Sequence, residues 1–418
     1  MSFSKNIEEF LTKEFDGLTK EAIDAMSVEE LENLQERITQ RRDEYALIES
    51  AYKTCANAAY GASANAGYYF YNVNLASDIT AECRALTKFF WNYLEEFLKE
   101  HIWNRKDIWE LCDFALDESK HDWIREQTIT HQADTDSVYM SYEPLFECFT
   151  EEYKKKYATD EAKVRWILDF YNKFMGAEQR RCCDELYNNR NGHNVHEFEL
   201  ELICKSTISL VKKKYVKSVV YEKGHFMLDK PKLKSTGVEI VKSTTPTICR
   251  RFLKELVDDL LYVYDIHHQE EFIYLINNKL SKFYKEFRTA PIDDISQSVG
   301  VGDYKKYVIC DTDRLELGLH CPFSVKAAAR YNYLANKAGR SDLKLMSGKI
   351  KYYNIRVGKN EDYFGYPYGE WPSEFAPPVD YTVQWRKTVI DPINRFLEAM
   401  KIPTIGETNS IQLGLFGF

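Results

Sequence analysis

Hydrophobic and polar residues follow a helical spacing through most of the first sixty positions. Ser27 and Glu30 form the S-x-x-E pattern of a capping box, so a helix is expected to begin at Val28. Apolar residues then recur roughly every three or four positions: Val28, Leu31, Leu34, Ile38, Ile48, Tyr52 and Cys55. We predict one long helix that runs to about Tyr60 and ends near Gly61, since glycine commonly follows a helix C-terminus.

Two short β-prone runs enclose an acidic turn in HQADTDSVYM, residues 131–140. Residues 128–130 lead into the turn and residues 138–140 lead out of it, which predicts a hairpin with Asp134, Thr135 and Asp136 at its tip. Two carboxylates in a tight turn suit a hard cation such as Mg²⁺. Aspartate is also common in turns that bind nothing, so the decapeptide alone leaves both interpretations open.

The remaining periodicity predicts a mixed α+β fold. Residues 79–103 fit a helix with a buried aromatic face, and residues 145–190 fit charged helices at a solvated surface. Residues 196–204 alternate as a strand, and residues 211–221 fit a basic strand. Residues 247–289 fit an amphipathic helical segment, with Phe252, Leu256, Leu260 and Val263 in helical register. We therefore expect an antiparallel sheet flanked by helices.

Composition places the chain among cytoplasmic globular proteins. Its 418 residues are 44% hydrophobic and 29% charged, they contain no run of 18 apolar residues, and the start, MSFSKNIEEF, is unlike a secretory signal. We expect no membrane association and about two or three domains. The ten cysteines include no C-x-x-C and are interpreted as reduced thiols. Cys182, Cys183, His193 and His196 fit no standard zinc spacing.

Charge is distributed unevenly along the chain. The formal net charge of −9 argues against a uniformly basic nucleic-acid binder, yet residues 205–254 hold 13 Lys and Arg against 3 Asp and Glu. The cluster begins with Lys212, Lys213, Lys214 and Lys217 on the predicted strand and continues through Lys232, Lys234 and Lys242. Such a strip either binds phosphate or protects a sheet edge from aggregation. We favour contact with a DNA backbone.

A second polar group lies at the end of the first long helix. Lys53, Asn57 and Tyr60 occupy positions i, i+4 and i+7, which share one helix face. A cation, an amide and a phenol together can contact a triphosphate, a sugar and a base. By spacing alone, a solvated polar face with Tyr60 packed into a core is the favoured interpretation.

Several of these segments resemble motifs of the family B DNA polymerases, in the family's order. Residues 53–61, KTCANAAYG, resemble motif B, and residues 133–137, ADTDS, resemble motif C. Further matches to the K-K-x-Y motif and to polymerases of T-even-type phages follow: KKKY at 212–215, KLKSTGVEIVKSTTP at 232–246, CPF at 321–323 and FAPPVDY at 375–381. Each match alone is weak, but their order makes the resemblance specific from about residue 30 to the C-terminus.

The resemblance implies a role for each of these residues. Asp136 would be the shared catalytic metal ligand, Asp134 a secondary one and Glu201 an outer carboxylate, around two Mg²⁺ ions. Glu201 is the better candidate of Glu199 and Glu201, and a solvent-facing glutamate is the alternative. Lys53, Asn57 and Tyr60 would bind the incoming nucleotide. The implied primer–template contacts are Lys212, Lys213, Lys214, Tyr215, Lys232 and Lys234. The implied domains are the end of the fingers (1–62), the palm (63–235), the thumb (236–405) and a tail (406–418).

One part of the family pattern is missing from the sequence. Motif A (D-x-x-S-L-Y-P-S), the exonuclease motif and the first fingers helix are not found, so we expect the C-terminal part of a split polymerase. A partner chain would supply the exonuclease and motif A. A natural split is favoured over a trimmed fragment. Ala58, Ala133 and Gln132 replace residues usual in the family, which makes rate and fidelity unsafe to infer. The alternative is a non-catalytic adaptor that binds DNA and a sliding clamp.

The C-terminal heptapeptide QLGLFGF carries a separate signal. Its apolar tip follows a polar stretch, a pattern that suits insertion into a pocket on another protein. The residues Gln412, Leu413, Leu415 and Phe416 resemble peptides that bind sliding clamps. The alternative is a tail that folds back on the preceding domain.

Overall fold

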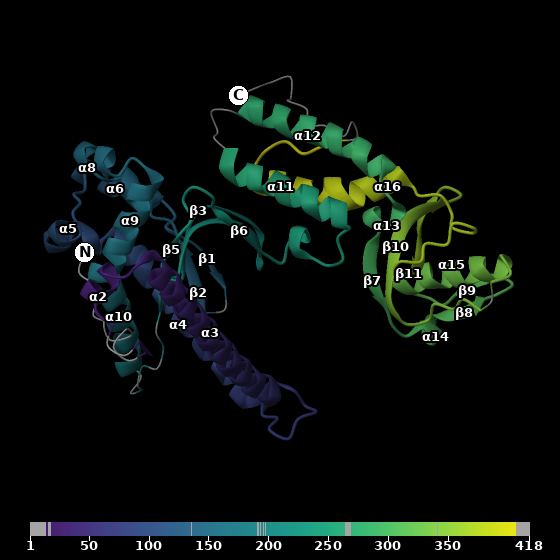
Figure 1. Cartoon of the computed structure of the whole chain (residues 1–418), viewed down its shortest axis with the longest axis horizontal. Coiled ribbons are helices and arrows are strands. Elements are labelled where there is room, and N and C mark those ends of the chain that lie inside the picture. The colour runs from purple at the N-terminus through teal and green to yellow at the C-terminus, as the bar shows by residue number, and fades with distance from the viewer. Residues whose placement is uncertain are drawn as a thin grey trace. The chain divides into compact units, whose positions relative to one another are not determined.

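The computed structural model describes residues 14–15, 18–134, 136–189, 192, 194, 196, 198–263, 269–340 and 342–406. The chain divides into two compact units, one formed by residues 1–93 with 135–139 and the other by residues 94–134 with 140–418. Figure 1 shows the helices and strands of the described residues. Helices alternate with several small antiparallel sheets, which confirms the α+β class. No described helix is both long and apolar enough to span a bilayer.

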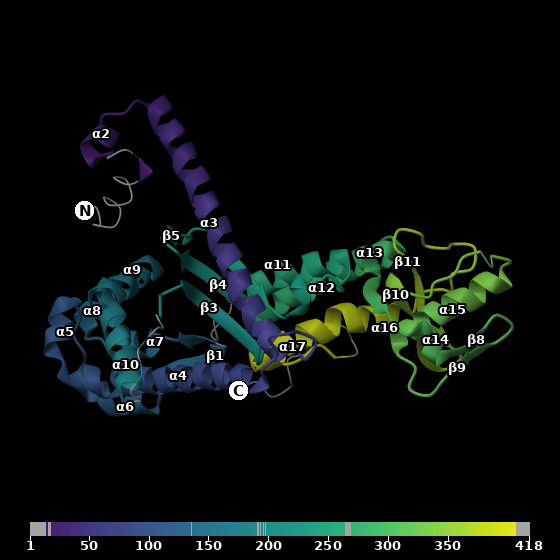
Figure 2. The same ribbon diagram turned by 90° about the horizontal axis from the view of Figure 1, so that it is seen from below.

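The first unit is dominated by the single long helix α3 (Val28–Ala64), which follows α2 (Lys20–Asp24) (Figure 2). The predicted capping box is confirmed, because Glu30 N donates to Ser27 Oγ at 3.3 Å and Ser27 N donates to Glu30 Oε2 at 2.8 Å. The predicted end near Gly61 is wrong. The helix continues to Ala64 and ends where Asn65 becomes extended, and nothing at Gly61 requires the left-handed conformation that makes glycine a helix terminator.

Helical spacing in α3 predicted the helix but not its burial. Within this fully described helix only Leu34 and Ser63 are buried, while Val28, Leu47 and Tyr52 are exposed. The next helix, α4 (Val73–Lys99), begins in this unit and ends in the other, and its aromatic face is buried at Phe90 and Phe97 as expected.

The helices after α4 enclose an aromatic cluster. They are α5 (Lys106–Leu111), α6 (His121–Glu126), α7 (Glu143–Glu147), α8 (Glu151–Lys156), α9 (Asp160–Phe170) and α10 (Gly176–Asn188). Phe149 and Phe170 lie with ring centroids 5.2 and 4.9 Å from Trp166, and Phe114 lies 5.3 Å from Phe149. The prediction of a solvated surface for 145–190 is therefore incomplete, because the charged residues of this segment are interleaved with apolar ones that form a core.

A twisted antiparallel sheet follows. It consists of β3 (Leu202–Val211), β4 (Lys214–Glu222), β5 (His225–Phe226) and β6 (Lys232–Thr236), with β4 paired to all three others. Two predictions need correction here. The strand expected over 196–204 begins only at Leu202, and the strand expected over 211–221 is interrupted by a turn at Lys212–Lys213 that joins β3 to β4. Alternating polarity does not distinguish one strand from a tight hairpin when the turn residues are lysines.

The C-terminal half forms two adjoining cores. In the first, α11 (Thr247–Val263) packs on α12 (Gln269–Thr289), with Phe252 and Phe283 stacked at 4.1 Å. The predicted helical segment 247–289 is thus two helices, with Phe252, Leu256 and Leu260 buried and the Val263 side chain outside the description. In the second core, α15 (Phe323–Lys337) packs on the sheet β11-β10-β7, made of β7 (Gln297–Val301), β10 (Gly348–Val357) and β11 (Asn360–Pro367).

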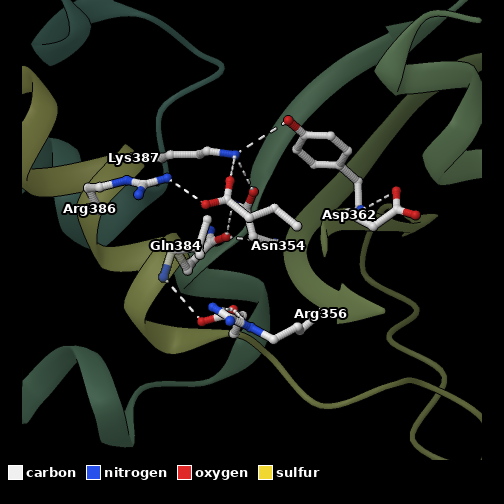
Figure 3. A network of polar contacts seen from close by, with 10 residues as sticks. Asn354, Arg356, Asp362, Gln384, Arg386 and Lys387 are labelled. Carbon is white, nitrogen blue, oxygen red and sulfur yellow. Dashed lines mark hydrogen bonds and ion pairs between the residues drawn. The ribbon is translucent and has the colours of Figure 1, made fainter. Parts of the chain in front are cut away.

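A buried polar network ties the two cores together (Figure 3). Gln384, on α16 (Tyr381–Trp385), accepts hydrogen bonds from the backbone N of Asn354 at 2.8 Å and from its Nδ2 at 2.6 Å. It also donates to the carbonyl of Ile295 at 2.6 Å. Lys387 donates to Asn354 Oδ1 at 3.2 Å and pairs with Glu361 at 3.0 Å. Because Gln384 and Asn354 are completely buried, the hydrogen bonds of their side chains satisfy groups that water cannot reach.

Candidate nucleic-acid interface

The predicted acidic hairpin forms, but Asp134 ends its first strand instead of lying in the turn, and Thr135 lies outside the described residues. β1 (Thr130–Asp134) and β2 (Ser137–Met140) make a two-stranded sheet, with Asp136 exposed in the turn. The sequence did not indicate the side chain that anchors the start of its first strand. Glu95 on α4 accepts bonds from Ile129 N at 3.0 Å, Thr130 N at 2.6 Å and Thr130 Oγ1 at 2.6 Å. Burial acts to raise the pKa of Glu95, but hydrogen bonds from Lys99 and Thr130 outweigh it and keep the pKa below its ordinary value.

Asp134 lies against the basic β3–β4 hairpin. The Tyr215 hydroxyl donates to Asp134 Oδ2 at 3.4 Å, and Lys213 Nζ lies 3.9 Å from Asp134 Oδ1. A second hydrogen bond joins the same two hairpins, because Ser209 Oγ donates to Gln132 Oε1 at 2.8 Å. The Asp134 side chain is 18% exposed and that of Lys213 is 63% exposed. The structure therefore brings motif C and the K-K-x-Y segment, 81 residues apart at Asp134 and Tyr215, into direct contact.

The lysines of the basic segment differ in their surroundings. Lys212 and Lys213 form the two-residue turn, where both are exposed and Lys213 has a φ of +63°. Lys214 is half-buried at the start of β4. Lys217 is buried, with its ammonium group 4.8 Å from the centroid of the Tyr215 ring. Of these four lysines, only Lys212 and Lys213 are exposed.

Lys232 and Lys234 are partly neutralised by a carboxylate that the sequence did not single out. On β6, Lys232 pairs with Val219 and Lys234 pairs with Lys217 of β4. Both ammonium groups bind Glu222, and the hydrogen bond from Lys234 is the largest factor that lowers the Glu222 pKa. The pKa of Lys234 is affected first by burial, which acts to lower it, but the pairing with Glu222 raises it overall.

No complete metal centre occurs within the described residues, where no group of three or more His, Cys, Asp and Glu side chains could hold an ion. Glu201, the predicted outer carboxylate, precedes β3, is 61% exposed and lies 4.0 Å from Lys234 Nζ. The candidate zinc residues form no such group among the described residues. Cys182 and Cys183 are buried, burial raises the pKa of Cys182 to about 12, and His193 lies outside the described residues. All ten cysteines belong to the described part, and none forms a disulfide there.

The predicted nucleotide-binding residues lie on the last turns of α3. Lys53, Asn57 and Tyr60 are all exposed, so Tyr60 is not packed in a core as the alternative had it. Lys53 Nζ pairs with Glu49 Oε1 at 2.6 Å, one turn earlier. Both side chains are more than half exposed, so this pair contributes little to stability.

A hollow beside β6 is lined by basic side chains, which the sequence indicated only as part of the local excess of lysine and arginine. It has a volume of about 490 Å³ and is lined by Leu233, Ser235, Ile240, Thr247, Arg250, Arg251 and Lys254. The three cations come from the first two turns of α11, and Arg251 also binds Glu286 on α12. They belong to the 13 Lys and Arg of residues 205–254, which could have flagged them.

The predicted clamp-binding residues Gln412, Leu413, Leu415 and Phe416 lie outside the described residues. The structure therefore leaves the prediction for the tail untested.

Comparison with known proteins identifies distant relatives. No protein-family model matches the chain. It is 22% identical over 377 residues to a DNA-directed DNA polymerase of Enterobacteria phage T4, covering 83% of this chain and 36% of the phage protein. It is 23% identical over 421 residues to a DNA-directed DNA polymerase of Escherichia phage RB69, covering 93% of this chain and 41% of that protein. The chain is thus a distant homologue of these phage family B DNA polymerases over most of its length, and spans about two fifths of theirs.

Proposed function

We propose that this chain is the C-terminal part of a family B DNA polymerase, which extends a primer 3′ end together with a polypeptide that supplies motif A. The observation that carries the proposal is the contact of Asp134 with Tyr215 and Lys213, because it joins the acidic hairpin to the basic β3–β4 hairpin. The distant homology to two phage DNA polymerases supports the same reaction. In this proposal residues 1–62, 63–235 and 236–405 correspond to fingers, palm and thumb.

The carboxylates present fit part of a magnesium site. Asp136 and Asp134 offer the oxygen donors that Mg²⁺ prefers, but two side chains are too few for a pair of ions about 4 Å apart. Motif A would complete the set, with Glu201 as an outer carboxylate. When bound, the two ions would activate the primer 3′-oxygen and stabilise the leaving triphosphate oxygens. In this chain Lys213 and Tyr215 orient Asp134, and Asp136 faces solvent, where a second donor segment can approach.

The basic residues support DNA binding through the phosphate backbone. Lys212 and Lys213 project from the β3–β4 turn, and Arg250, Arg251 and Lys254 line the hollow beside β6. Lys214, Tyr215, Lys232 and Lys234 complete the proposed primer–template surface. Backbone neutralisation of this kind gives an affinity that falls steeply with salt. Lys53, Asn57 and Tyr60 are proposed to receive the incoming nucleotide, and the tail, residues 406–418, to bind a sliding clamp.

The test is a reconstitution with the polypeptide of the same source that carries D-x-x-S-L-Y-P-S. We expect the purified chain alone to incorporate no nucleotide and the pair to extend a primer. Asp136→Ala should abolish extension and leave DNA binding intact. Asp313→Ala is the matched control, because Asp313 is also an exposed aspartate in a turn, between β8 (Val308–Asp311) and β9 (Leu315–Leu317).

Each outcome separates the proposal from its competitors. Robust extension by the single chain would exclude the need for a partner. Equal extension by Asp136→Ala and Asp313→Ala would exclude catalysis at the hairpin and favour a non-catalytic adaptor that binds DNA and a clamp. Absence of salt-dependent DNA binding by the pair would exclude both.

A further inference from the structure

The connection from α3 to α4, together with the first two turns of α4, exposes a group of apolar side chains that we call the aromatic surface. It consists of Tyr68, Tyr69, Phe70, Tyr71, Val73, Leu75 and Ile79. Exposure ranges from 40% at Ile79 to 96% at Tyr69. With about 200 Å² for each aromatic side chain, the four rings alone leave about 550 Å² in contact with water. This sum lies within the range of about 300–600 Å² for the largest apolar patch of a typical monomer, before the three aliphatic side chains are added.

The aromatic surface is held in place by its backbone. Tyr68 N donates to Asn65 O at 3.0 Å, Tyr71 N donates to Tyr68 O at 3.1 Å, and Asn72 N donates to the carbonyl of the buried Ser63 at 2.9 Å. Asn72 Oδ1 then accepts from Leu75 N at 3.0 Å, at the start of α4. These bonds fix the backbone that carries the rings, so a partner that covers the surface would lose little free energy to ordering this backbone.

The composition of this segment selects a protein as the occupant. Residues 62–77 contain no charged residue, in a chain that is 29% charged. Aromatic enrichment with charge depletion is typical of the core of a protein–protein interface. A nucleic acid would require cations beside the rings, because stacking platforms for single strands lie in positively charged grooves.

We propose that the aromatic surface docks the polypeptide that supplies motif A, an inference that rests on the proposed function. The surface begins eight residues after Tyr60, the last of the three residues proposed to bind the nucleotide. Motif A has to reach the same nucleotide, so the segment that carries it has to lie beside the end of α3. This chain leaves about three fifths of each relative's length uncovered. A polypeptide of that length is large enough to bury the aromatic surface. A standard interface buries about 800 Å² on each partner, of which the aromatic surface would provide most.

The experiment measures the affinity of the chain for the D-x-x-S-L-Y-P-S polypeptide by titration calorimetry. We expect Tyr69→Ser and Phe70→Ser each to weaken binding by about tenfold or more, as truncation of buried interface aromatics does. Both rings are largely exposed in the chain alone, so neither change should lower its unfolding midpoint. Tyr274→Ser is the control, since Tyr274 is 70% exposed on α12 in the other unit. This variant should bind the D-x-x-S-L-Y-P-S polypeptide with an affinity within about twofold of that of the unaltered chain.

The outcomes distinguish this inference from the function on which it rests. If the unaltered chain does not bind the motif A polypeptide, the two-chain function fails. If it binds, and both serine variants bind equally well, the docking surface alone is wrong. Sedimentation of the chain alone tests a second copy as occupant, and self-association lost in Tyr69→Ser would overturn the proposal. Loss of single-stranded DNA binding in that variant would overturn it in favour of a nucleic acid.

Discussion

Gly237 lies against the turn that presents Lys213, which makes the turn open to a sharp test. Gly237 follows β6 with a φ of +65°, and a Cβ added there would lie 2.4 Å from the carbonyl oxygen of Lys213 and 3.2 Å from Lys214 Cγ. Real Cβ atoms do not approach other heavy atoms closer than 3.0 Å, so Gly237→Ala must separate the two backbone segments by at least about 0.6 Å. The lysine turn and the contact of Lys213 with Asp134 should move with them.

Gly224 provides the matched control. It lies in the turn between β4 and β5 of the same sheet, with a φ of +88°, and an added Cβ there has no described neighbour within 4 Å. Gly224→Ala should therefore lose only the conformational part, about 1–2 kcal/mol for a left-handed alanine. Gly237→Ala adds a backbone clash, comparable to overpacking at about 1–3 kcal/mol, for a total of about 2–5 kcal/mol.

Urea denaturation followed by circular dichroism measures the stabilities, and fluorescence anisotropy of a labelled primer–template measures DNA binding over a range of salt concentrations. We expect Gly237→Ala to lower both stability and DNA affinity, and Gly224→Ala to lower stability alone. The reasoning is refuted if the two variants are equally stable and bind DNA equally well, because the close approach of the Gly237 and Lys213 backbones would then have no consequence.

Three further predictions follow from other parts of the chain. Gln384→Ala leaves the amide groups of Asn354 and a backbone carbonyl without their buried partner, and should lower the free energy of unfolding by about 3–5 kcal/mol in urea titrations. The pKa of Glu222 lies below its ordinary value of 4.5, chiefly through the hydrogen bond from Lys234, so its stabilisation is complete above pH 4.5 and is lost as the pH falls further. The difference in thermal midpoint between the unaltered chain and Glu222→Gln should accordingly shrink on acidification below pH 4.5. Deletion of residues 411–418 should abolish stimulation by a sliding clamp and spare basal extension by the reconstituted pair, and unchanged clamp stimulation would disprove that role.

The sequence by itself determined the local elements. The capping box at Ser27, the acidic hairpin around Asp136 and the helical register of Phe252 depend on residues within one or two turns of each other, and all three form as expected. Interactions of that range are encoded in neighbouring side chains and backbone preferences. The resemblance to family B polymerases likewise rested on short contiguous motifs.

The tertiary structure alone decided which of the candidate cations are available. Lys213 and Lys217 are four positions apart in one basic run, yet the first is exposed in a turn and the second is buried under its neighbours. Lys234 is bound by Glu222 from the adjacent strand, and the hairpin of motif C is anchored by Glu95, 35 residues before Thr130. Burial and pairing depend on strands and helices brought together from distant positions, so a run of like charges in the sequence could not reveal them.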